Sequence, residues 1–121
     1  MAGFPSGAPT APKVVAGGWF FEDGRRAAEE ALDAAEEGLF CCNDRLAEAV
    51  TAWCRKHRRP EPKLIGFDDA PVAARMNLTT IAIPWEELVE SAVRVIKRRL
   101  AGDRSVASHH LLNPRPVVRR I

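Results

Sequence analysis

Short apolar runs alternate with helix-like segments along this chain, and that alternation restricts the folds it can adopt. The runs are VVAGGW, GLFCC, KLIGFDD and LTTIAIP, and the segments EDGRRAAEEALDAAEE and NDRLAEAVTAWCRKH separate the first three. Parallel strands need a crossover connection, usually a helix. The order therefore predicts an α/β fold with a mainly parallel sheet flanked by helices. SHHLLN and PVVRRI are two weaker strand candidates near the end.

The clearest helix is PWEELVESAVRVIKRRLAG. Glutamates lie in its first turn and basic residues near its last, which suits the helix dipole. Its apolar residues recur every three or four positions and form one stripe: Trp85, Leu88, Val89, Ala92, Val93, Ile96 and Leu100.

Composition limits the class of protein. The length of 121 residues fits one domain, which we place at residues 14–121 after a flexible Pro/Gly-rich leader at 1–13. A net charge of +2 does not indicate a nucleic-acid binder, and three cysteines do not suggest a disulfide framework. No secretory signal and no run of about 20 apolar residues is visible, so we expect a cytoplasmic protein that makes no membrane contact.

Polar or aromatic side chains follow three of the strand candidates. Trp19 follows the first run, Asn43 and Asp44 the second, and Asp68 and Asp69 the third. Ligands of open α/β sheets bind outside the carboxyl ends of the strands. An aromatic ring with amide and carboxylate groups suits a polyhydroxylated ligand. The alternative is that the polar residues only cap helices or form turns, and either Asn43 or Asp44 suits the cap of the following helix.

Other chemistry is weakly indicated. RKHRR at residues 55–59 reads better as a solvated helix end than as a nucleic-acid patch. The cysteines form no C-x-x-C pair, and two of them, Cys41 and Cys42, read as packing residues of a central buried strand. No second carboxylate or nucleophile is placed by spacing beside Asp68 and Asp69. We expect no metal, no cofactor and no enzymatic activity.

Four segments in order carry a resemblance to a known family: LFCCNDRLAEAV, KLIGFDDAPVAA, LTTIAIPWEELVESAVRVIKRRLAG and PVVRRI. Together they resemble the C-terminal part of LacI/GalR-family bacterial transcription regulators, whose regulatory region resembles periplasmic sugar-binding proteins. The resemblance covers about residues 14–121. It implies the second subdomain of a type I periplasmic-binding-protein-like domain, truncated, that senses a sugar or related small polar metabolite and forms a homo-oligomer, expected to be a dimer.

The resemblance also implies roles for single residues. Asn43 and Asp68 would contact the effector and Trp19 would stack on it, while Asp44 and Asp69 would serve as cap and turn residues. Two departures leave the effector open. Gly18 stands where relatives often carry an acidic residue, and Met76-Asn77 stands where relatives have prolines before LTT.

The family's helix-turn-helix headpiece and first subdomain have no counterpart in these 121 residues. DNA would therefore be bound only through a headpiece absent from this chain, and one wall of a cleft would bind effector poorly alone. The resemblance places the stripe of the 85–100 helix against that first subdomain. Exposing such side chains costs roughly 1.5–3 kcal/mol each, so we expect a second chain, or refolding onto the chain's own subdomain, to bury the stripe. Two alternatives are a fragment of a periplasmic sugar-binding protein serving transport, and a stand-alone oligomerisation module.

Overall fold

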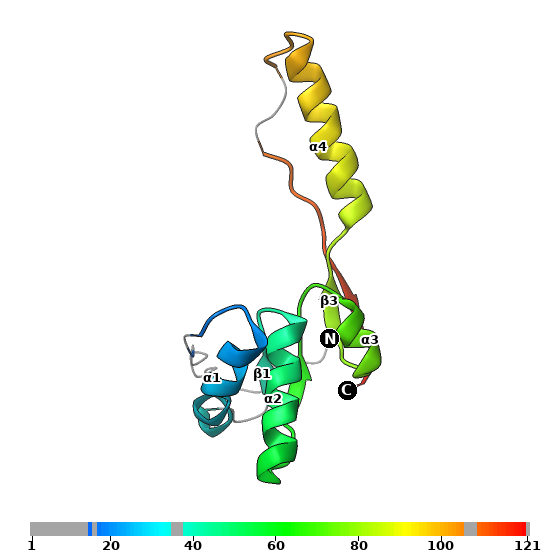
Figure 1. The fold of residues 1–121 in the computed structure, drawn as a ribbon. Coiled ribbons are helices and arrows are strands. Elements are labelled where there is room, and N and C mark those ends of the chain that lie inside the picture. Colours follow the sequence, from blue (N-terminus) through cyan, green and yellow to red (C-terminus); the bar gives the residue numbers. More distant parts are fainter. Residues whose placement is uncertain (1–14, 16, 35–37, 106–108, 121) are drawn as a thin grey trace, which may run out of the picture.

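A computed structural model describes residues 15, 17–34, 38–105 and 109–120. The predicted leader at residues 1–13 lies outside these ranges, as does part of the first strand candidate. The described part of that candidate, Val15 and 17–19, is not in a strand. The remaining elements follow one another in the order α1, β1, α2, β2, α3, β3, α4 and β4 (Figure 1).

The strands confirm the predicted α/β fold with a mainly parallel arrangement. β1 (Gly38–Phe40) pairs in parallel with β2 (Lys63–Ile65). Parallel bridges at Ile65–Thr79 and Asp68–Ala82 connect the β2 side to β3 (Thr80–Ala82). β4 (Arg115–Val117) then pairs with β3 in the antiparallel sense. PVVRRI thus contributes to a strand, whereas the described part of SHHLLN, residues 109–113, forms none.

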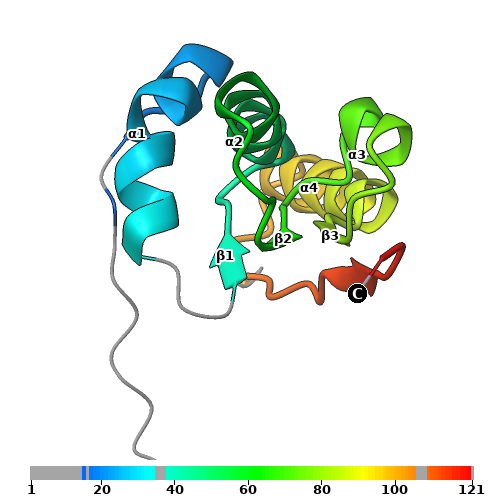
Figure 2. The same ribbon diagram turned by 90° about the horizontal axis from the view of Figure 1, so that it is seen from below.

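The helices α1 (Phe21–Ala34) and α2 (Asp44–His57) confirm two of the predicted helical segments. They pack against each other, and small residues let them come close. A Cβ atom added to Gly24 would lie only 2.7 Å from the Cβ of Ala49. α3 (Pro71–Arg75) is a short helix that begins at a proline, a residue favoured in the first turn. In Figure 2, α2 and α3 lie on the same side of β1, β2 and β3.

The core lies between α1, α2, α3 and the strands. It contains the buried residues Ala28, Leu32, Cys41, Ala47, Val50, Cys54, Leu64, Ala73 and Leu78. Cys41 is buried as expected, and burial raises the pKa of its thiol to about 12. Cys42 is exposed, so the prediction that it is a packing residue is wrong. β1 is also less central than predicted, because among the described residues it pairs on one side only and Phe40 is exposed.

The helix α4 (Trp85–Leu100) confirms the clearest sequence prediction, but it does not pack on the rest of the chain. Figure 1 shows it extending away from the other helices and strands, with the chain running back to β4 beside it. None of its residues is buried. The alternative that α4 refolds onto its own subdomain is therefore wrong. Its burial by a second chain stays a prediction.

We expect Leu78→Ala to lower the free energy of unfolding by about 2–5 kcal/mol, because Leu78 is completely buried and its truncation leaves a cavity. Urea unfolding followed by circular dichroism measures the change. Leu111→Ala is the matched control, since Leu111 is 97% exposed and its truncation should change stability by less than about 0.5 kcal/mol. Equal losses for the two variants would contradict this placement of the core.

Candidate functional site

The polar residues that follow β1 and β2 lie next to one another. Three backbone hydrogen bonds hold the strand ends side by side. The N–H of Cys41 donates to the carbonyl of Ile65 at 2.8 Å, that of Asp44 to Phe67 at 3.0 Å, and that of Asp68 to Ile81 at 2.9 Å. The predicted meeting of the 43–44 and 68–69 pairs at one edge is thus present in the structure.

Asn43 caps α2. Its Oδ1 accepts a hydrogen bond from the N–H of Leu46 at 2.9 Å, and its Nδ2 donates to the carbonyl of Trp19 at 3.0 Å. The first contact is the usual N-cap bond, in which a side-chain oxygen satisfies an N–H of the first turn. The assignment of the cap to Asp44 is therefore wrong. Asn43 also ties the segment before α1 to the end of β1.

Asp44 holds the strand ends together from inside the protein. It is 1% exposed. Its Oδ1 accepts from the hydroxyl of Thr80 at 2.6 Å, and its Oδ2 accepts from the N–H of Ala70 at 2.7 Å. Gly66 leaves room for this carboxylate, since a Cβ there would lie 2.2 Å from Oδ1. One side chain thereby joins the start of α2, the start of α3 and β3.

Asp69 is engaged in a second internal contact. Its Oδ1 accepts from Nη2 of Arg119 at 2.8 Å, and Nη1 of the same guanidinium donates to the carbonyl of Leu78 at 2.9 Å. Arg119 therefore ties the segment after β4 to both the 68–69 turn and β3. The resemblance implied a turn role for Asp69, but no local pattern predicted this partner, because the two residues lie 50 positions apart.

Asp68 differs from its neighbours, because its carboxylate accepts no hydrogen bond from any described residue while Asn43, Asp44 and Asp69 are all engaged. Its backbone has a φ of 107°, and Asp69 follows with a φ of 53°. Residues other than glycine rarely adopt such angles, and they concentrate at functional sites. Burial, and secondarily the nearby negative charge of Asp44, raise the pKa of Asp68. A half-buried acceptor without an internal partner is available to a ligand.

Trp19 and Phe20 supply aromatic surface at the start of α1. Their side chains are 67% and 72% exposed. The turn that presents them is fixed by Asp23, whose Oδ2 accepts from the N–H of Phe20 at 3.0 Å. A Cβ added to Gly18 would lie 2.2 Å from that same oxygen. A side chain at position 18 would therefore displace the carboxylate that caps this turn.

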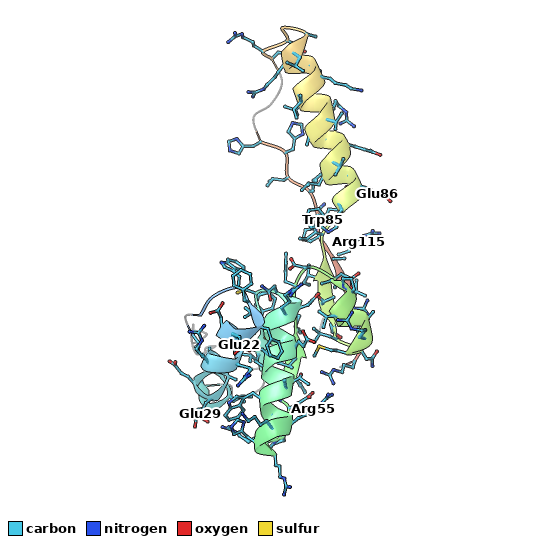
Figure 3. The ribbon with its side chains drawn as sticks, in the orientation of Figure 1. Glu22, Glu29, Arg55, Trp85, Glu86 and Arg115 are labelled. Carbon is cyan, nitrogen blue, oxygen red and sulfur yellow. The ribbon has the colours of Figure 1, made fainter. Side chains whose placement is uncertain are left out.

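A groove lies apart from these residues, between α1 and α2. Phe21, Trp53, Lys56 and His57 line it, together with Arg25 and Arg26. Trp53 stacks on His57 with ring centroids 4.0 Å apart. Figure 3 shows Glu22 and Arg55 on this part of the molecule, far from Trp85 and Glu86 at the base of α4. The groove contains none of the strand-end residues.

In the part of the chain that the structure describes, no three His, Cys, Asp or Glu side chains are grouped so as to hold a metal ion. None of the described helices combines the length and the apolar character needed to cross a membrane.

The chain matches a family model described as a periplasmic binding protein-like domain over residues 6–120. Solved structures share its fold. One is a LacI family transcriptional regulator from Enterococcus faecium with bound ribose, with 24% identity and a TM-score of 0.75 over 87% of this chain and 41% of that one. Another is a regulatory protein of the LacI family from Chloroflexus aggregans, with 25% identity and a TM-score of 0.74 over 85% and 40%.

A third, the complex of the transcriptional regulator CelR with cellobiose, has 24% identity and a TM-score of 0.75 over 85% of this chain and 34% of that one. The chain thus spans about two-fifths or less of the length of these three structures. No curated protein matches it.

We expect Asp44→Ala to destabilise the fold, because the hydroxyl of Thr80 and the N–H of Ala70 would lose their acceptor. Each buried donor left without a partner costs about 1–3 kcal/mol. Chemical denaturation at pH 7 measures the loss. Arg45→Ala changes the adjacent exposed residue and should leave stability within about 0.5 kcal/mol. A similar small effect for Asp44→Ala would show that its carboxylate is not structural.

We expect Asp68→Asn to stabilise the protein at pH 7 and to have less effect near pH 3. The pKa of Asp68 is raised in the folded state, so between the unfolded and folded values the folded state holds more protons and stability falls as pH rises. Thermal unfolding across this range measures the difference. Asp69→Asn should instead destabilise at pH 7, since it weakens the contact with Arg119. Loss of stability in both variants would contradict the contrast between the two aspartates.

Proposed function

Because this chain belongs to the periplasmic binding protein-like domain family, we propose that it is the effector-sensing and dimerisation region of a LacI-type transcriptional regulator. The observation that carries the proposal is the carboxylate of Asp68, the one acceptor among the four polar strand-end residues without an internal partner in the described chain. It lies outside the carboxyl end of β2, where ligands of open α/β sheets bind.

The effector is a sugar or a related small polar metabolite. The carboxylate of Asp68 accepts hydrogen bonds from the hydroxyl groups of the effector. Asn43 donates through the second hydrogen of its amide, since the first is used by the carbonyl of Trp19. The exposed ring of Trp19 stacks on an apolar face of the ligand. The bound ribose of the Enterococcus faecium structure and the bound cellobiose of CelR support this ligand class.

The regulation is conformational and requires no catalysis and no cofactor. Effector bound at the strand ends favours one arrangement of two subdomains, and a ligand shifts such an equilibrium only by its difference in affinity for the two states. DNA is contacted by a headpiece outside these 121 residues, in the cytoplasm. The present chain supplies one wall of the effector cleft, so it binds the effector weakly when alone.

We expect a ¹H–¹⁵N NMR titration of this chain with pentoses, hexoses and disaccharides, ribose and cellobiose included, to show weak, millimolar binding. The shifted signals should be the amide of Asp68, the side-chain amide of Asn43 and the indole of Trp19. Asp68→Ala removes the acceptor and should abolish the shifts, while Trp19→Ala should weaken binding about tenfold.

Glu29→Ala is the control, because it removes an exposed carboxylate on α1 and should leave the titration unchanged. Shifts that survive in Asp68→Ala, or a panel that leaves all three signals unmoved, would refute the proposed site.

A further inference from the structure

The segment after β4 closes on the turn that carries Asp68 and Asp69. β4 lies beside β3 (Figure 2), and Arg119 follows it by two residues. The Nη2 atom of Arg119 donates to Oδ1 of Asp69 at 2.8 Å, and its Nη1 atom donates to the carbonyl of Leu78 at 2.9 Å. The side chains of Arg119 and Asp69 are only 21% and 32% exposed. A rigid, planar guanidinium that uses two nitrogens on two partners fixes the direction of both contacts.

The backbone of Arg119 is also held in place. The hydroxyl oxygen of Thr79 accepts from the N–H of Arg119 at 3.0 Å and from the N–H of Arg120 at 3.1 Å. The same hydroxyl donates to the carbonyl of Arg120. The side chain of Arg120 pairs with Glu61 at 3.3 Å. The guanidinium of Arg119 therefore reaches Asp69 from an anchored backbone.

The 68–69 turn needs such a restraint, because its backbone is strained. The φ angles are 107° at Asp68 and 53° at Asp69, in a region that residues other than glycine rarely adopt. Such conformations persist only where the surrounding structure holds them. On either side of Asp69, the N–H of Asp68 donates to β3 at 2.9 Å and the N–H of Ala70 donates to Asp44 at 2.7 Å. The N–H of Asp69 itself makes only a long contact, at 3.4 Å, with Thr80.

We propose that Arg119 is a positioning residue for the effector site. It holds the carboxylate of Asp69 toward the segment after β4, and it thereby keeps the turn in the conformation that leaves the carboxylate of Asp68 free for a ligand. Without Arg119, the turn would relax toward negative φ and both aspartate side chains would change direction. The unpaired charge of Asp69 would also repel that of Asp68.

This inference rests on the proposed function for the ligand, but the turn can be observed without one. The three-bond coupling between the amide and α protons reports φ. At a φ of 107° this coupling is small for Asp68, and it becomes larger when φ moves to extended, negative angles. The conformation of Asp68 and the affinity of the chain for sugar are therefore separate measurements.

NMR spectroscopy of the full chain tests the inference. Arg119→Gln removes the charge and the planar fork, so the Asp68 coupling should rise and the dissociation constants for ribose and cellobiose should rise about tenfold. That factor corresponds to about one molecule in ten that keeps the competent turn, because the apparent dissociation constant varies inversely with this fraction. Arg119→Lys keeps the charge without the fork, and both measurements should fall between those of the wild type and Arg119→Gln.

Arg120→Gln is the matched control, because it removes the same charge from the next residue and breaks the ion pair with Glu61. It should leave the Asp68 coupling and the sugar affinity unchanged. The amide signal of the buried Ala47 reports whether each variant is folded. Arg119→Lys carries the test if Arg119→Gln does not fold.

The outcomes separate this inference from the proposed function. An unchanged Asp68 coupling in Arg119→Gln, or an equal change in Arg120→Gln, would overturn the positioning role. A changed coupling with unchanged sugar affinity would also overturn it, since the turn would then not govern the ligand. A wild-type chain that binds no sugar refutes the proposed function, and the coupling alone then decides whether Arg119 positions Asp68.

Discussion

The packing of the strands with α2 and α3 depends on the hydrogen bonds of the buried Asp44 carboxylate. It is nearly inaccessible to water, yet it accepts hydrogen bonds from Thr80 on β3 and from the backbone of Ala70 at the start of α3. Its position in the first turn of α2 also suits the helix dipole. These contacts offset the cost of burying a charge, and they require that Gly66 carry no side chain. Asp44 thereby fixes the positions of the parallel strands, two helices and the 68–69 turn relative to one another.

That arrangement leaves one member of the cluster unsatisfied. Asn43, Asp44 and Asp69 each have internal partners, whereas Asp68 has a left-handed backbone, a raised pKa and a carboxylate that nothing described binds. A strained, partly desolvated acid costs stability, and such costs are retained where a site needs a preorganised group. The surrounding hydrogen bonds keep Asp68 in this conformation. The same contacts therefore stabilise the fold and preorganise the proposed site.

Local patterns in the sequence were sufficient to predict most of the helices and strands. Helical spacing located α1, α2 and α4, and the short apolar runs located β1, β2 and β3 in the correct order. The meeting of Asn43 and Asp68 at one edge followed from parallel topology alone. The separate roles of Asn43 and Asp44 could not be predicted, because the backbone conformation determines which of two adjacent Asx side chains faces the interior. Arg119 was missed for a related reason, since a contact over 50 positions leaves no local signal. The exposure of α4 in the described chain could not be predicted either, because the spacing of an apolar stripe is the same whether it is covered or open.

The route from Asp68 to α4 is short. The backbone N–H of Asp68 donates to Ile81 on β3, and the chain passes from Ala82 through Ile83 and Pro84 directly into Trp85. β4 supports that strand from the other side, and Arg119 ties the segment after it back to Asp69. The helix α4 is thus attached to the same two strands that border the proposed effector site. Because only Ile83 and Pro84 separate β3 from α4, the start of this helix takes its position from the same strand whose backbone holds Asp68.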